Sequence, residues 1–525
     1  MCVSPVRLVV VLLLGLSVTV SARTDGGRTF IVEETTIAQV HAGFLTGNLT
    51  CLGLVTSYLN RIERFDQDGP ALNAIASTNP QAIAEAHRLD RDFAERGLTG
   101  PLHCVPVIVK DNIETAGWET TAGSLALKGF LPERDAAAIT KLKQAGALIL
   151  AKGNMPDFAL NVLTTVNLIR GATQNPYALD RVPAGSSGGT AVAVAANFGL
   201  VGLGTDTGGS VRGPAAHLSL VGMRPTMGLS SRAGIVPLDA NSDVVGPLAR
   251  TVEDMAIVLD VLTGWDPNDA STEAVHRLGS LPTSQSTLAE GLNGMRIGIL
   301  SQAYLGGPLK IDPQVARLFA RALTDLSSLG VEIVDTVALT AIQPLPGMEH
   351  CQGLKYDLNA YLKQQGNRVP VHSLQEIIAS GRYHPSVEQD LLAMQASPQQ
   401  GPGSKACEAS AAYRASVAAA MTAAMDRLNL DALVYPTWSQ QPQHTNHIDP
   451  LGAGQTLRFA TAAGFPALSV PMGFTTEVLP SGLSLLGRKW ADAHLLRLAY
   501  AYEQATRHRR PPVIAPPIPC ECHIR

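Results

Sequence analysis

The sequence has few aromatic residues, few charged residues and no large excess of either charge. Aromatic residues make up 5% and charged residues 16% of the 525 positions, and the formal net charge is -4 at pH 7. A chain that is 46% apolar with so little net charge is not intrinsically disordered. The lack of a basic surplus argues against a nucleic-acid partner. A charged fraction below the usual ~25% favours a large fold with much buried sheet.

The sequence also lacks an apolar run long enough to cross a bilayer as a helix, which takes roughly 20 residues. A shorter run, Leu8 to Val20, follows Arg7 at the N-terminus, and Val20-Ser21-Ala22 forms a small-residue cleavage site. This pattern predicts a signal peptide over residues 1–22 and a mature domain over 23–525. We therefore expect a secreted or periplasmic protein with no integral membrane span.

Cysteines are few: they stand at positions 2, 51, 104, 351, 407, 520 and 522, and signal-peptide removal would leave six. An even number in an oxidising compartment permits disulfides, but the spacing does not determine how they pair. The tail residues Cys520 and Cys522 lack a second pair of metal ligands, so we predict a disulfide or free thiols there and no metal site. Asn48 heads the single glycosylation sequon, which matters only in a eukaryotic source.

Helical and strand patterns alternate along the chain. Thr50 is the expected N-cap of a helix over 52–62. Further helices are predicted over 81–96, 135–145, 190–198, 313–328 and 491–506, and strands over 105–109, 147–151, 200–204, 295–300, 331–337, 431–436 and 465–473. The alternation predicts a largely parallel sheet faced by helices in one compact domain. The segment 338–410, richer in Gln, His, Ser and Gly, is predicted to be an insertion or cap that shapes a substrate pocket.

Two serine-bearing glycine turns give the strongest indication of chemistry. They are Ala184-Gly-Ser-Ser-Gly-Gly-Thr190 and Gly204-Thr-Asp-Thr-Gly-Gly-Ser-Val-Arg212. Consecutive N–H groups in such a turn form a concavity that stabilises an anion. The second turn suits an oxyanion hole in which Ser210 is the nucleophile. The N–H groups that would face the developing charge are those of Thr207, Gly208, Gly209 and Ser210.

Two other functions fit these turns less well. A phosphate-binding loop would need Gly-Lys-Ser/Thr, and neither turn has that lysine. Gly185-Ser-Ser-Gly-Gly189 matches the G-x-S-x-G nucleophile elbow of esterases, with Ser187 at its centre. That elbow requires a strand directly before it, whereas the segment 175–183 is loop-like.

A serine nucleophile also needs a base, and neither turn contains a histidine. His217 follows a helix-like run and is expected to be a packed or surface residue. Lys110 ends the apolar run Val105 to Val109, and burial can lower the pKa of a lysine far below about 10.4. Taken alone, Lys110 would fit a surface lysine paired to Asp111, but together with the two serine-bearing turns it is a better candidate for the base than His217.

The three motifs that contain these residues are similar to those of the amidase signature family. They are Val109-Lys-Asp-Asn112, Gly185-Ser-Ser-Gly-Gly189 and Gly204-Thr-Asp-Thr-Gly-Gly-Ser-Val-Arg212, and the resemblance spans residues 36–512. Supporting matches are Gly100-Pro-Leu-His103, Gly246-Pro-Leu-Ala-Arg-Thr-Val-Glu-Asp254, Asp431-Ala-Leu-Val-Tyr-Pro-Thr437 and Gly482-Leu-Ser-Leu-Leu-Gly487. The resemblance implies an α/β fold, a single large mixed β-sheet covered by helices on both faces.

The resemblance also implies a Ser-cisSer-Lys triad of Ser210, Ser186 and Lys110, with a cis peptide bond before Ser186. Ser186 matches the bridging position because it is the first serine of its pair. Asp206 and Arg212 are implied to pair and hold the second turn. Such an enzyme hydrolyses a carboxamide to a carboxylate and ammonia or an amine through a Ser210 acyl-enzyme.

Several points remain open from the sequence. No metal or organic cofactor is required, and the expected partner is a small-molecule or peptide amide of unknown identity. The alternatives are a serine esterase that uses Ser187 and a non-catalytic or glutamine-amidotransferase-like subunit. The chain departs from the family pattern at Cys104, where glycine is usual, and at 241–245, where Asn-Ser-Asp-Val-Val replaces the commoner Thr-Gln-Asp-Thr-Ala. The oligomeric state is not predicted.

Overall fold

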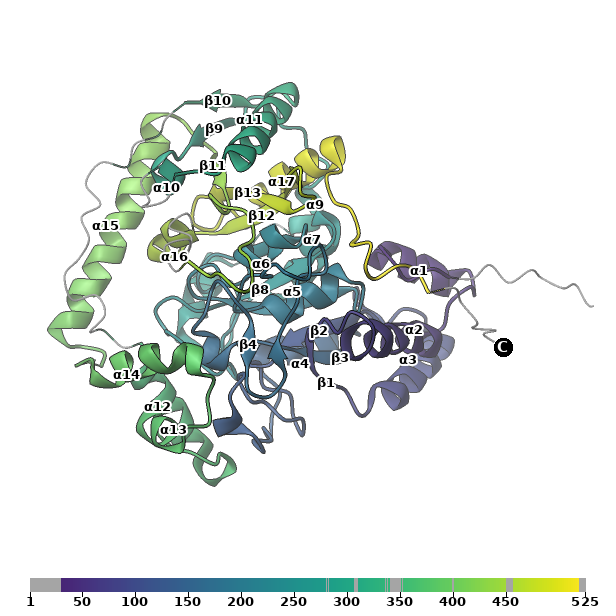
Figure 1. Cartoon of the computed structure of the whole chain (residues 1–525). Coiled ribbons are helices and arrows are strands. Elements are labelled where there is room, and N and C mark those ends of the chain that lie inside the picture. Colours follow the sequence, from purple (N-terminus) through teal and green to yellow (C-terminus); the bar gives the residue numbers. More distant parts are fainter. Residues whose placement is uncertain are drawn as a thin grey trace, which may run out of the picture.

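An eleven-stranded sheet forms the centre of the molecule in the computed structural model (Figure 1). The structure describes residues 30–518 except 280, 282, 306–309, 336, 338, 340–350, 352, 399–400 and 450–456. The predicted signal peptide and the tail cysteines therefore lie outside the described residues. Along the sheet the strands are β1 (Ile75–Thr78), β3 (Leu148–Gly153), β2 (Pro106–Lys110), β6 (Val201–Asp206), β8 (Val244–Ala249), β7 (Val221–Arg224), β12 (Ala467–Phe474), β13 (Pro480–Gly487), β11 (Ala432–Pro436), β9 (Arg296–Ile299) and β10 (Glu332–Val334).

The sheet is mixed, as the family resemblance implies. Parallel pairs form at β2–β3, β2–β6, β9–β10 and β9–β11, and the pairs β1–β3, β6–β8, β7–β8, β7–β12, β12–β13 and β11–β13 are antiparallel. The expectation of a largely parallel sheet is therefore wrong in the middle of the sheet. There β12 and β13 are joined by a tight turn, in which the Thr475 N–H donates to the Leu479 carbonyl at 2.9 Å, rather than by a helix.

Helices cover both faces of this sheet. Successive side chains of a strand point to opposite faces, yet every residue of β2, β3, β6, β8 and β11 is buried. The small side chains of α5 (Gly188–Ala195) let it pack directly on β2, β3 and β6. α6 (Arg212–His217) and α17 (Asp492–Thr506) pack on β12 and β13. This double coverage explains the large apolar fraction and the low charge.

The remaining elements surround this core. They are α1 (Ile37–Leu45), α2 (Cys51–Ile62), α3 (Ala82–Arg96), α4 (Ala137–Gln144), α7 (Val252–Leu262), α8 (Glu273–Leu278), α9 (Ser284–Thr287), α10 (Gln302–Leu305), α11 (Pro313–Ser328), α16 (Arg458–Ala463) and the small hairpin β4 (Val166–Asn167) with β5 (Gly171–Ala172). Within the described ranges, no helix combines the length and the apolarity that a membrane crossing needs.

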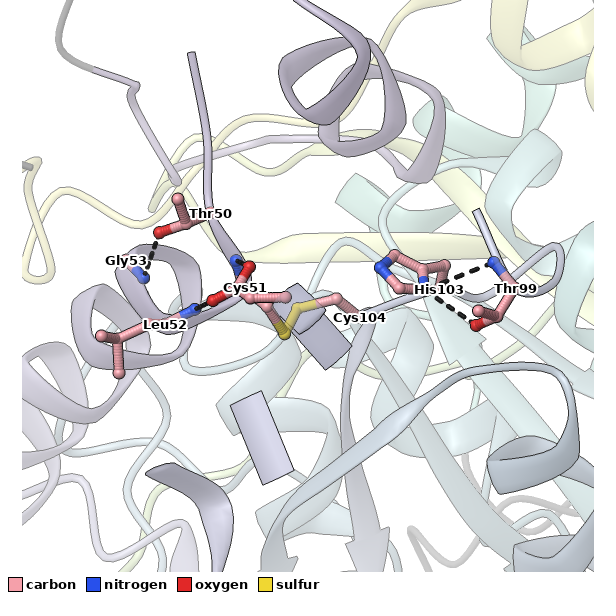
Figure 2. Close-up of a disulfide and its surroundings, with 8 residues drawn as sticks. Thr50, Cys51, Leu52, Gly53, Thr99, His103 and Cys104 are labelled. Atoms are coloured by element: carbon pink, nitrogen blue, oxygen red, sulfur yellow. Dashed lines mark hydrogen bonds between the residues drawn. A yellow bond between two sulfur atoms is a disulfide. The ribbon is translucent and has the colours of Figure 1, made fainter. Parts of the chain in front are cut away.

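A disulfide joins Cys51, the first residue of α2, to Cys104, which precedes β2 (Figure 2). The predicted N-cap is confirmed, because Thr50 accepts a hydrogen bond from the Gly53 N–H at 3.1 Å. Cys104 has φ 52°, in the left-handed region that favours glycine. The chain thus keeps a glycine-like backbone at a position where the family usually has glycine, while the side chain at that position ties α2 to the sheet.

Most of the described part of segment 338–410 is helical. α12 (Leu354–Gln365), α13 (Leu374–Ser380) and α14 (Glu388–Ala396) share an apolar core with residues of the loops after β2 and β3. A second disulfide, Cys351–Cys407, joins the start of this segment to the first turn of α15 (Lys405–Arg427). Figure 1 shows α15 running from α14 towards α10, and its second half shares an apolar cluster with residues of α10, β11 and α16.

Candidate active site

Lys110 ends strand β2 and is fully buried. Its Nζ donates to Ser186 Oγ at 2.7 Å and to Thr205 Oγ1 at 2.8 Å. Burial lowers the pKa of Lys110 from 10.5 to about 7, although the carboxylates of Asp243 and Asp206 oppose the shift. A large fraction of this amine is therefore neutral near pH 7 and can accept a proton.

Ser186 follows a cis peptide bond from Gly185, as the resemblance implies. A Cβ atom on Gly185 would lie 2.4 Å from the carbonyl oxygens of Asn161 and Thr164, so the turn has no room for a side chain there. Ser186 itself is fully buried. The sequence expectation that Lys110 and Ser186 lie together is met by the 2.7 Å contact between their side chains.

Ser187 links the two glycine turns. Its N–H donates to the Ser210 carbonyl at 3.1 Å and its Oγ donates to the Thr205 carbonyl at 3.3 Å. The side chain is fully buried, and no strand directly precedes it. The strand–turn–helix geometry that exposes the serine of a nucleophile elbow is therefore absent around Ser187.

Ser210 lies in the turn between β6 and α6 and faces a large cavity. One of the four predicted oxyanion donors is already engaged, because the Gly209 N–H donates to Asp206 Oδ1 at 3.0 Å. The N–H groups of Thr207, Gly208 and Ser210 have no protein acceptor within the part of the chain that the structure describes. Three donors thus stay available to an oxyanion.

Asp206 stabilises this turn through buried ion pairs. It accepts from Arg212 Nε and Nη2, each at 3.1 Å, and from Arg224 Nη1 at 3.2 Å, and all three side chains are fully buried. Burial alone would raise the pKa of Asp206, but the two guanidinium groups hold it below its ordinary value. The Asp206–Arg212 pair that the resemblance implies is present and fully buried. Sequence reasoning missed Arg224, although an arginine directly after the apolar run Leu220 to Met223 was an available signal.

Segment 241–245, whose sequence differs from the family pattern, contacts the turn that holds Ser210. Asp243 accepts from Thr207 Oγ1 and, at 2.9 Å, from the Leu238 N–H. The Asn241 carbonyl accepts from Arg414 Nη1 of α15 at 2.7 Å. Sequence reasoning missed Asp243 as a neighbour of the candidate base, because no local pattern connects it to Lys110.

His217, which the sequence predicted to be either packed or on the surface, is packed. Its ring stacks on Trp438 with 5.0 Å between centroids, and burial lowers its pKa to about 3. A histidine that is held neutral, and whose ring nitrogens hydrogen-bond to no residue that the structure describes, does not compete with Lys110 as a base.

A cavity of about 610 Å³ opens over the Ser210 turn. Residues of α12, α14 and α15 contribute to its wall, and the role of segment 338–410 as a cap that shapes a substrate pocket stays a prediction. Its lining residues are Ala159, Leu160, Val162, Thr207, Gly208, Ser210, Leu238, Asp239, Ser242, Cys351, Gly353, Leu354, Ala393, Met394, Ser397, Arg414, Arg458, Thr461 and Ala462. The mainly apolar lining suits the acyl part of a substrate.

Residues 53–496 match the family model described as Amidase. A glutamyl-tRNA(Gln) amidotransferase subunit from Desulforapulum autotrophicum is 34% identical over 486 residues, which cover 90% of this chain and 97% of that protein. A probable amidase of Arabidopsis thaliana is 32% identical over 510 residues, with 92% of each chain covered.

A solved structure is similar over the same length. The native peptide amidase from Stenotrophomonas maltophilia superposes with a TM-score of 0.83 and is 36% identical, and the match covers 92% of this chain and 99% of that one. The similarity therefore extends over most of the chain and is not confined to the glycine turns.

Proposed function

The chain belongs to the amidase family and is an amide-hydrolysing enzyme, and from this premise we propose that it cleaves a carboxamide through an acyl-enzyme on Ser210. The observation that carries this proposal is the 2.7 Å contact between Lys110 Nζ and Ser186 Oγ in a fully buried setting. Burial makes the amine a base near neutral pH, and the contact gives that base a defined proton donor. The products are a carboxylate and either ammonia or an amine.

In this mechanism, neutral Lys110 accepts the proton of Ser186, Ser186 accepts the proton of Ser210, and Ser210 Oγ attacks the carbonyl carbon. The oxyanion that forms is stabilised by the N–H groups of Thr207, Gly208 and Ser210. The relay then runs backwards and protonates the leaving nitrogen as the C–N bond breaks. Water attacks the ester through the same relay, which releases the carboxylate and restores Ser210.

The experiment is a hydrolysis screen over alkyl, aryl and peptide amides with Lys110→Ala, Ser186→Ala and Ser210→Ala. We expect Lys110→Ala and Ser210→Ala to lose nearly all activity. Ser187→Ala is the matched control for the glycine turn, and an organophosphonate label mapped by mass spectrometry identifies the nucleophile. Near wild-type activity in Ser210→Ala or Lys110→Ala, or labelling of Ser187, would contradict the mechanism and would favour the esterase alternative.

A second candidate is a glutamine-dependent amidotransferase component, because several relatives such as that of Desulforapulum autotrophicum bear an amidotransferase name. Such a component would need partner proteins, whereas a hydrolase acts alone. Gel filtration combined with a glutaminase assay, with and without a cell extract, separates the two. Activity on simple amides by the purified chain supports the hydrolase.

We also propose that residues 1–22 are a cleaved signal peptide and that the mature enzyme is secreted or periplasmic. The basic residue, short apolar run and small-residue site support this location. Intact mass spectrometry of the exported protein is expected to give an N-terminus at Arg23. A mature protein that retains the leader in the cytosol would exclude the proposal and would favour the amidotransferase candidate.

A further inference from the structure

Among the residues that the structure describes, two arginines and one carboxylate, Asp239, line the cavity over Ser210. The guanidinium group of Arg414 is held by residues of the cavity wall and of the segment behind it. It donates to the Asn241 carbonyl at 2.7 Å and to Ser242 Oγ at 3.1 Å. It also lies 3.6 Å from the Asp239 carboxylate. The carboxylate of the cavity is thus paired with Arg414. Arg458 is exposed and has no ion-pair partner among the residues that the structure describes. The described lining of the cavity therefore carries one positive charge more than its carboxylate balances.

The position of Arg458 is fixed relative to the Ser210 turn. The preceding residue, Leu457, accepts a hydrogen bond at its carbonyl from Arg212 Nη2 at 3.0 Å. The Leu457 side chain covers Gly209 so closely that a Cβ on that glycine would lie 2.4 Å from Leu457 Cδ1. Arg458, the first residue of α16, therefore starts beside the candidate nucleophile's own turn and extends into the same cavity.

The rest of the cavity wall is suited to an apolar chain. Leu160, Val162, Leu238, Leu354 and Met394 supply most of its larger side chains. Burying an alkyl or aryl group against such a wall is favourable, whereas a carboxylate is stable only beside a donor of charge-assisted hydrogen bonds. The planar guanidinium group of arginine binds a carboxylate with two parallel hydrogen bonds.

We propose that Arg458 is a carboxylate subsite and that the preferred substrates are amides whose acyl part is an apolar chain ending in a carboxylate. Monoamides of dicarboxylic acids belong to this class. The proposal rests on the proposed function, since it assumes that the acyl group occupies the cavity over Ser210. Arg458 acts here on substrate choice and has no part in the proton relay.

The test compares adipamic, suberamic and sebacamic acids with the neutral amides of equal chain length, hexanamide, octanamide and decanamide. The readout is the ratio of kcat/KM for the carboxylated amide to kcat/KM for its neutral partner, in wild type, Arg458→Gln and Arg458→Lys. Loss of one charge-assisted contact is expected to lower this ratio about tenfold in Arg458→Gln, with a smaller loss in Arg458→Lys. Arg427→Gln, an exposed arginine on α15 outside the cavity, is the matched control and keeps the wild-type ratio.

The outcomes separate the two proposals. If neutral amides are hydrolysed in a Ser210-dependent way but the ratio is unchanged in Arg458→Gln, only the carboxylate subsite is refuted. If hydrolysis survives Ser210→Ala, the proposed function fails. If no amide in the series is turned over, calorimetric titration of Ser210→Ala with adipamic acid and hexanamide decides the subsite, because the proposal requires tighter binding of the acid and its loss in Ser210→Ala/Arg458→Gln.

Discussion

The proton affinity of Lys110 gives the most direct test of the chemistry. With its pKa lowered from 10.5 to about 7, about half of the amine is neutral at pH 7. An ordinary lysine would be only about 0.03% neutral at that pH, so burial multiplies the available base by roughly a thousandfold. We therefore expect kcat/KM to rise about tenfold per pH unit below pH 6 and to level off above about pH 8.

Two substitutions examine the cause of this profile. Lys110→Arg keeps a charge of similar reach but stays protonated at every pH of the assay, so it cannot act as a base and is expected to be inactive. Asp243→Asn removes a carboxylate that raises the pKa of Lys110, so the midpoint of the profile should move to lower pH. Asp243 also accepts from Thr207, so only the midpoint, and not the maximal rate, is the measure of this effect.

The same shift also affects stability. Between about pH 7 and 10.5 the unfolded chain binds more protons than the folded chain, so the free energy of unfolding rises with pH in this range. The loss of unfolding free energy caused by burying Lys110 is therefore full below pH 7 and disappears as the pH rises to 10.5. At pH 7 this loss is about 4 kcal/mol. Urea unfolding should therefore show that Lys110→Met raises the free energy of unfolding above that of wild type, by the largest amount at pH 7 and the smallest at pH 10. An active Lys110→Arg, a flat pH profile, or a Lys110→Met difference that does not change with pH would refute the reasoning.

Three further predictions concern the scaffold. Asp206→Asn leaves two buried guanidinium groups without a counter-charge, and we expect urea unfolding to show a loss of about 3–5 kcal/mol; a loss below 1 kcal/mol would contradict the ion-pair assignment. Gly209→Ala should abolish turnover, because the φ of Gly209 is 115° and the new Cβ would lie 2.4 Å from Leu457 Cδ1. Gly208→Ala is the matched control and should stay folded, because the space around its Cβ is open. The double variant Cys51→Ser/Cys104→Ser opens a link of sequence separation 53, and should lose about 4 kcal/mol of unfolding free energy with kcat little changed at 25 °C; equal thermal midpoints for both proteins would argue against it.

The sequence predicts the features that are encoded locally. α11 covers 313–328 as its helical spacing indicates, and α3 begins one residue later than expected. Lys110 and Ser210 stand out for the same reason, since a lysine that ends an apolar strand and a serine within a glycine turn each have a recognisable neighbourhood. Ser186 is preferred to Ser187 through the family resemblance alone, and it is the serine whose side chain lies 2.7 Å from Lys110.

Features that depend on strand order could not be predicted in this way. Thr205 reaches Lys110 because β6 lies beside β2 in the sheet. Arg224 reaches Asp206 from β7, although β8 comes between β6 and β7 in the sheet and follows both in the chain. The disulfide partners lie far apart in sequence, so only the folded arrangement of α2 and β2 pairs Cys51 with Cys104. The cavity wall likewise combines distant segments.

The position of β2 between β3 and β6 makes reactivity depend on the assembled sheet. Lys110 is enclosed by β3 and β6 and contacts Ser186 and Thr205, so its environment is assembled from segments that lie 76 and 95 residues further along the chain. Before that assembly the amine is hydrated and protonated at neutral pH, and it cannot activate a serine. The proposed enzyme would thus be latent as a nascent or partly unfolded polypeptide without any inhibitory propeptide, and its catalytic competence would serve as a reporter of correct folding.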